Sequence, residues 1–106
     1  MKSRYLVRWT HEAESDAATI VEFFQDPLNA EKIIVQFGEK ADSLQTLPER
    51  GRVVPELRKI GVLSYREVIH KPWRMIYQVQ GHEVWIMAVL DARRDLIDLL
   101  FERLAR

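Results

Sequence analysis

Three runs in the last third of the chain decide the fold: Ser64-Tyr65-Arg66-Glu67-Val68-Ile69, Trp73-Arg74-Met75-Ile76-Tyr77-Gln78-Val79 and Val84-Trp85-Ile86-Met87-Ala88-Val89-Leu90. The runs are rich in β-branched and aromatic residues, and short turns at 70–72 and 81–83 separate them. This pattern predicts three consecutive antiparallel strands. Because the third run is almost wholly apolar, we expect it to be buried on both faces and to lie centrally in the sheet.

The residues before these runs predict one strand followed by a helix hairpin. Residues 5–9 show the period of two that is typical of a strand. Thr10 is a suitable N-cap for a first helix, and Asp26 followed by Pro27 caps and opens a second. Their link is short, so we expect an antiparallel hairpin over about residues 11–47. The expected buried stripes are Ala13, Ala17, Ile20 and Phe24 on the first helix, and Ala30, Ile33 or Ile34, Phe37, Ala41, Leu44 and Leu47 on the second.

The remaining segments complete an α+β fold. Residues 48–52 form a loop, and residues 53–63 have no clear period, so we expect an irregular crossing segment with room for a short strand or turn. Leucines at helical spacing between 93 and 104 predict a terminal helix. The order is β-α-α-β-β-β-α in a single domain, residues 1–106, with the hairpin packed on one face of a small, mostly antiparallel sheet. The opposite face is expected to carry the arginines.

The composition excludes several classes of protein. The 106 residues include no cysteine, which rules out disulfides and thiol catalysis. No apolar run approaches the roughly 20 residues that a membrane-spanning helix needs, and the first residues lack the apolar core of a signal peptide. We therefore expect a cytoplasmic protein that contacts no membrane. His11, His70 and His82 show no ligand spacing, so neither a metal nor a cofactor is expected.

The charges are unevenly distributed, although the net charge is zero. Residues 1–49 carry five Lys/Arg and nine Asp/Glu, whereas residues 50–106 carry eleven Lys/Arg and seven Asp/Glu. This asymmetry suggests one face for an anionic partner. Arg66 and Arg74 lie on neighbouring expected strands, and Arg93 and Arg94 directly follow the third. We therefore expect at least three of these four to gather as exposed groups on one surface.

Two of these arginines also have a purely structural interpretation. Arg74 can pair with Glu67 across the strand hairpin, and Arg93 can pair with Asp91 or Asp95. Because Arg93 and Arg94 would begin the terminal helix, where the helix dipole disfavours positive charge, an anionic partner for at least one of them is the preferred interpretation.

Taken together, the motifs resemble those of the RelE/ParE superfamily of toxins from type II toxin–antitoxin systems, also known as plasmid stabilisation proteins. The similarity covers nearly the whole chain and is closer to the ParE branch, whose long hairpin and following loop it shares. It rests on Pro48-x-x-Gly51-Arg52, Glu56-Leu57-Arg58, Tyr65-Arg66, Trp73-Arg74-x-Ile76-Tyr77-x-Val79 and Arg93-Arg94.

The resemblance implies a toxin that poisons DNA gyrase by binding, without chemistry of its own, and that a cognate antitoxin neutralises in a hetero-oligomer. The alternative is a RelE-like, metal-independent endoribonuclease that cuts mRNA on the ribosome, with Arg66, Arg74 and Arg93 as the catalytic cations. A third possibility is an inactive relative that serves only as a binding module. The partner-binding residues implied are Arg52, Arg66, Trp73, Arg74, Arg93 and Arg94.

The chain departs from the nuclease pattern at three places. Many relatives have a histidine just after the last strand, where this chain has Asp91. Several nucleases have a tyrosine in the terminal helix, where this chain reads Ile97-Asp98-Leu99-Leu100, and Val68 stands at a position that is basic in RelE-like enzymes. These departures leave the catalytic residues unknown and favour the ParE-like interpretation.

Overall fold

The computed structural model describes residues 4–24 and 26–104. Within these ranges the elements follow in the order β1 (Leu6–Trp9), α1 (His11–Glu22), α2 (Pro27–Asp42), the 3-10 turn η1 (Ser43–Gln45), β2 (Arg52–Val53), α3 (Pro55–Arg58), β3 (Tyr65–His70), β4 (Trp73–Gln80), β5 (Glu83–Asp91) and α4 (Leu96–Leu104). The predicted α+β order and the strand meander are confirmed. The segment without a clear period contains β2 and α3.

The strands form one sheet in the order β1-β5-β4-β3-β2. β1 runs parallel to β5, and the other neighbours are antiparallel. β5 has a strand on each side, which confirms the interior position that its apolar sequence predicts, although β4 occupies the middle of the sheet.

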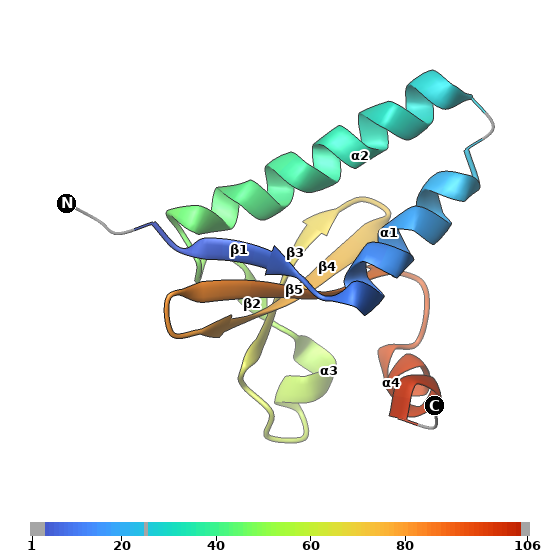
Figure 1. The fold of residues 1–106 in the computed structure, drawn as a ribbon. Helices are drawn as coiled ribbons and strands as arrows, with labels where there is room; N and C mark the ends of the chain where they lie inside the picture. The colour runs from blue at the N-terminus through green and yellow to red at the C-terminus, as the bar shows by residue number, and fades with distance from the viewer. Residues whose placement is uncertain (1–3, 25, 105–106) are drawn as a thin grey trace.

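The hairpin of α1 and α2 covers one face of the sheet (Figure 1). Both predicted caps are present: the Ala13 amide donates to Thr10 Oγ1 at 3.1 Å, and the Leu28 amide donates to Asp26 Oδ1 at 3.0 Å. The core on this side includes Ala13, Phe37, Ala41, Leu44, Val68, Met75, Tyr77, Val84, Ile86 and Val89.

The structure decides two points about the predicted buried stripe of the second helix. Ile33 packs against the core, whereas Ile34 is 55% exposed. The prediction that Leu47 is buried is wrong, because it is 55% exposed. The regular helix ends at Asp42 and η1 ends at Gln45, so the helical period no longer applies at position 47.

The second face of the sheet is covered by α3 and α4 (Figure 1). Their apolar residues and those of the sheet form a second cluster: Val54, Leu57, Ile76, Ala88, Leu90, Leu96 and Leu99. The expectation that this face presents an arginine surface is therefore wrong. Burial of both faces explains why β5 is apolar at consecutive positions.

A bulge in β5 lets this strand serve both clusters. Ile76 pairs with Ala88 and Tyr77 pairs with Ile86, so Met87 is an extra residue between them. Ile86 therefore faces the hairpin, whereas Ala88 faces α3 and α4. The Met87 carbonyl accepts hydrogen bonds from Thr10 and from Arg103 of α4, each at 3.4 Å.

In the described part of the chain, no helix is both long and apolar enough to cross a bilayer.

Candidate functional site

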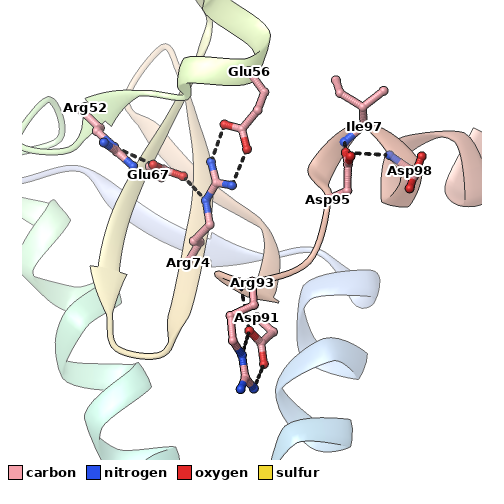
Figure 2. Close-up of polar contacts among 9 residues, drawn as sticks. All are labelled: Arg52, Glu56, Glu67, Arg74, Asp91, Arg93, Asp95, Ile97 and Asp98. Atoms are coloured by element: carbon pink, nitrogen blue, oxygen red, sulfur yellow. Dashed lines mark hydrogen bonds and ion pairs between the residues drawn. The ribbon is translucent and has the colours of Figure 1, made fainter.

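Arg74 lies within the protein and is committed to ion pairs (Figure 2). The residue is 6% exposed. Its Nε donates to Glu67 Oε1 at 2.6 Å, and its two terminal nitrogens donate to the Glu56 carboxylate at 2.5 and 2.7 Å. The structural interpretation, pairing with Glu67, is confirmed, and the expectation that Arg74 is a surface group is wrong.

Glu67 links this pair to a second arginine. It is 1% exposed, and its other oxygen accepts from Arg52 Nε at 2.6 Å. The four residues Arg52, Glu67, Arg74 and Glu56 tie together β2, β3, β4 and α3 (Figure 2). They are here called the buried network after the buried Glu67–Arg74 pair at its centre; the side chain of Glu56 is 32% exposed and that of Arg52 is 63% exposed. The hydrogen bonds from Arg74 lower the pKa of Glu56, and those from Glu56 raise the pKa of Arg74, so both stay charged. The two cations and two anions balance, so the network as a whole carries no net charge.

Arg66 lies on the other face of the sheet. Its register partner is Tyr77, which belongs to the core beneath the hairpin, whereas Arg74 is paired with Ile69 on the opposite face. The Arg66 guanidinium donates to the Gly51 carbonyl at 2.8 Å. Residues that pair across neighbouring strands lie on the same face, and successive residues along a strand alternate between faces, so Arg66 and Arg74 lie on opposite faces and cannot form one surface.

The turn that Arg66 binds has a steric requirement for glycine. The Gly51 amide donates to the buried Tyr77 hydroxyl at 3.0 Å, and burial raises the pKa of that tyrosine. A Cβ at position 51 would lie 2.4 Å from the Glu67 carbonyl oxygen and 2.8 Å from the Tyr77 hydroxyl. The Pro48-x-x-Gly51-Arg52 motif therefore has a structural reason in this chain.

Arg93 and Arg94 differ from Arg74, because both are exposed. The side chain of Arg93 is 83% exposed and that of Arg94 is 56% exposed. Asp91 accepts from the backbone amide of Arg93 at 2.9 Å and from its Nη2 at 2.7 Å, which confirms one of the predicted pairings. The hydrogen bonds from the Arg93 side chain lower the pKa of Asp91 to about 2. Arg94 makes a longer contact with Glu102 at 3.7 Å.

The sequence predicts that Arg93 and Arg94 begin the terminal helix, but in the structure neither of them does. α4 starts at Leu96, and the Asp95 carboxylate accepts from the amides of Ile97 and Asp98 at 2.9 and 3.3 Å (Figure 2). Asp95 is therefore occupied as a helix cap, and it does not pair with Arg93. The exposed arginines belong to the loop between β5 and α4.

This loop borders a groove of about 580 Å³ between α1, the adjoining ends of β4 and β5, and α4. Its apolar lining includes Ile20, Phe23, Phe24, Pro72, Trp73 and Leu99, and its rim includes Arg93, Arg94 and Glu102. Phe23 is 83% exposed, so the groove presents aromatic surface to solvent. Trp73 packs edge-on against Phe37 and Phe24, with ring centroids 5.3 and 6.2 Å apart.

The wall that α4 contributes is fastened to α1. Arg103 Nη2 donates to both oxygens of Asp16 at 2.6 Å, and its Nη1 lies 3.2 Å from the Glu12 carboxylate. Asp16 also accepts from the amide of Val89 in β5 at 3.1 Å. These contacts fix the width of the groove.

The structure thus brings together three of the predicted partner-binding residues, Trp73, Arg93 and Arg94. It places Arg52 and Arg74 in the buried network and Arg66 at the Gly51 turn, about 13 Å along β4 from Trp73 at the usual rise per residue. The prediction that three of the four arginines gather is wrong. The sequence analysis did not predict Phe23 as a residue of the groove. The Phe23-Phe24 doublet indicated it, because only one of two adjacent aromatic residues at the end of a helix can face the core.

Within the described residues, no group of three or more His, Cys, Asp or Glu side chains could hold a metal ion. His70 is part of the framework, with its Nε2 2.9 Å from Gln36 Oε1 and its ring stacked on Trp73. The site therefore offers apolar contact and exposed guanidinium groups.

Comparison with known proteins assigns the family. The family model described as "ParE toxin of type II toxin-antitoxin system, parDE" matches residues 7–96. The chain belongs to the ParE toxin family. This confirms the resemblance to the RelE/ParE superfamily and its ParE branch, and the chain is the toxin component of a type II toxin–antitoxin system.

Solved structures share the fold. A chain of the chromosomal ParDE toxin–antitoxin system from P. aeruginosa is 22% identical, with a TM-score of 0.68, covering 83% of this chain and 96% of that one. A chain of the toxin–antitoxin complex RelBE2 from Mycobacterium tuberculosis is 20% identical, with a TM-score of 0.59, covering 86% and 94%. Among curated proteins, none matches this sequence.

Proposed function

We propose that this ParE-family toxin acts in the cytoplasm by binding DNA gyrase, without chemistry of its own, and that a cognate antitoxin neutralises it. The observation that carries the proposal is the state of Arg74. It is 6% exposed and bonded to two carboxylates, so it is not available to a phosphate. Arg66 is likewise engaged with a backbone carbonyl.

Metal-free RNA cleavage needs accessible cations around the scissile phosphate, together with an acid and a base. Of the three arginines that such a mechanism would use, only Arg93 is exposed, and its side chain pairs with Asp91. This supports a function based on binding over a ribosome-dependent endonuclease.

The groove between α1 and α4 is the proposed antitoxin site. An amphipathic segment with apolar anchors would fill the aromatic lining, and acidic side chains would meet Arg93 and Arg94 at the rim. The groove has the size of a typical ligand site, about 580 Å³, but it is open and lined on several elements, which suits a peptide segment.

Gyrase and growth assays test the proposal. Expression without the antitoxin should stop growth, and the purified protein should inhibit gyrase supercoiling or trap cleaved DNA. Addition of the antitoxin should reverse both effects. Codon-specific mRNA cleavage on ribosomes with unaffected gyrase would replace the proposal by the nuclease alternative. Normal growth combined with tight antitoxin binding would indicate an inactive binding module.

A further inference from the structure

The outer face of α2 carries a stripe that the fold leaves uncovered. Its members are spaced by four and three residues alternately, and they are Leu28, Lys32, Val35, Glu39 and Asp42. At 3.6 residues per turn they fall within an arc of about 80°, on the side opposite the buried Phe37. In Figure 1, α2 runs along the upper outside of the molecule, and no other described element lies beyond it.

The apolar members of this outer stripe are strongly exposed. Leu28 is 75% exposed and Val35 is 52% exposed, and the neighbouring Ile34 is 55% exposed. Ile34 lies about 100° round the helix from Val35 and so stands outside the stripe. Single exposed apolar residues are common, but Leu28 and Val35 are seven residues apart, which is the heptad spacing of a helix-packing surface.

Two of the three charges of the stripe, Lys32 and Glu39, are placed so that they can pair with a second copy of the stripe. Lys32 lies about 4.5 Å before Val35 along the helix axis, and Glu39 lies about 6 Å after it. If a second copy packs antiparallel with the two-fold axis beside Val35, Lys32 of each copy comes opposite Glu39 of the other. A parallel arrangement would oppose lysine to lysine and glutamate to glutamate. Neither Lys32 nor Glu39 forms an ion pair within the described residues.

We propose that the outer stripe of α2 is a self-association surface, on which a second copy of this chain packs with its own α2 antiparallel. The contact involves one helix from each copy, so its area falls at the low end for protein interfaces and the dimer is weak and dependent on concentration. The groove is lined by α1, β4, β5 and α4 and by no residue of α2, so dimerisation leaves the groove open. The inference does not rest on the identity of the toxin's target.

Sedimentation equilibrium of the purified chain, from about 1 μM to about 1 mM, covers the range in which an interface of this size dissociates. The wild type should show a monomer–dimer equilibrium. Lys32→Glu and Glu39→Lys each replace two attractive contacts with two repulsive ones, so each variant should dimerise at least about tenfold more weakly. The double variant Lys32→Glu/Glu39→Lys should recover the wild-type dissociation constant.

Mixing the two single variants tests whether these charges act across the contact between the two copies. In a mixed dimer, the glutamate introduced in one variant would face the lysine introduced in the other, and the unchanged Glu39 and Lys32 would face each other. The mixture should therefore dimerise more tightly than either variant does alone. Lys59→Glu, an exposed charge reversal away from α2, is the matched control and should behave as the wild type. A wild type that stays monomeric throughout, or single variants that dimerise as the wild type does, would overturn the proposal.

Discussion

Arg74 and Arg93 each form a hydrogen-bonded pair with a carboxylate, yet they lie in different environments (Figure 2). The Arg74 side chain is 8% exposed and holds two carboxylates from two elements of the second sheet face. The Arg93 side chain is 83% exposed and holds a carboxylate two residues away in its own loop. The comparison teaches that burial, and not the presence of a partner, separates a structural arginine from one that a partner protein can reach.

The largest effect is expected for Arg74→Ala. The substitution removes three charged hydrogen bonds and leaves the buried Glu67 with Arg52 alone, so the free energy of unfolding should fall by about 3–5 kcal/mol. Urea denaturation followed by circular dichroism measures this. The double variant Glu67→Gln/Arg74→Met, which removes the buried charges together, should lose less than Arg74→Ala. A loss within about 0.5 kcal/mol for Arg74→Ala would place it with ordinary surface residues.

Gly51→Ala tests the turn that borders the buried network. Since the new Cβ would meet a backbone oxygen at 2.4 Å, the backbone of β3 or of the turn must shift, and we expect a loss of about 2–3 kcal/mol in the free energy of unfolding. Gly38→Ala is the control, because a Cβ there meets nothing within 4 Å and alanine favours the helix by about 1 kcal/mol. Equal stability of the two alanine variants would show that the turn is not constrained.

For the exposed arginines of the groove rim, we expect that substitution weakens binding without lowering the stability of the fold. Arg93→Ala and Arg94→Ala should each change the free energy of unfolding by no more than about 0.5 kcal/mol. Loss of an anchoring contact at the groove rim should weaken antitoxin binding by about 2 kcal/mol, roughly 30-fold, measured by isothermal titration calorimetry. Arg58→Ala, an exposed arginine at the end of α3, is the matched control. Unchanged affinity in both variants would mean that the rim arginines contact only solvent.

The smallest effect is expected for the stability of the protein at acid pH, where Glu56 and Asp91 contribute over different pH ranges. Both Glu56 and Asp91 have a lowered pKa in the folded protein, so each stabilises the fold above its unfolded pKa and ceases to do so as the pH falls. The Glu56 contribution begins to disappear below its ordinary value of 4.5, and that of Asp91 between 3.8 and about 2. Glu56→Gln should therefore flatten the upper part of an acid titration of stability, and Asp91→Asn the lower part. Identical titration curves for both variants would contradict this assignment.

Much of the fold was predictable because it depends on local patterns. The apolar runs predicted the meander, and Thr10 and Asp26 predicted both helix starts, since capping is decided by residues close in sequence. The burial of Leu47 was mispredicted, because helical spacing alone does not show where a helix stops. The bulge at Met87 left no sequence signal beyond a continuous apolar run.

The candidate site was less predictable, since it depends on contacts between distant segments. The pairing of Arg74 with Glu67 was expected from neighbouring strands, but the contact with Glu56 depends on α3, a four-residue helix in a segment without a clear period. Likewise, Trp73 and Arg93 line the same groove because the ends of β4 and β5 adjoin. Phe23 lines it as well because α1 crosses these strand ends. The positions of the arginines on neighbouring strands predicted one arginine surface. Because both faces of the sheet are covered, the arginines do not share one surface.

Hydrogen–deuterium exchange of the chain with and without its cognate antitoxin tests most directly the claim that the groove binds and the buried network supports the fold. We predict that the antitoxin slows exchange at the end of α1 around Phe23 and across residues 91–103, and leaves residues 52–58 unchanged. Protection confined to residues 52–58, with none at residues 91–103, would contradict the account.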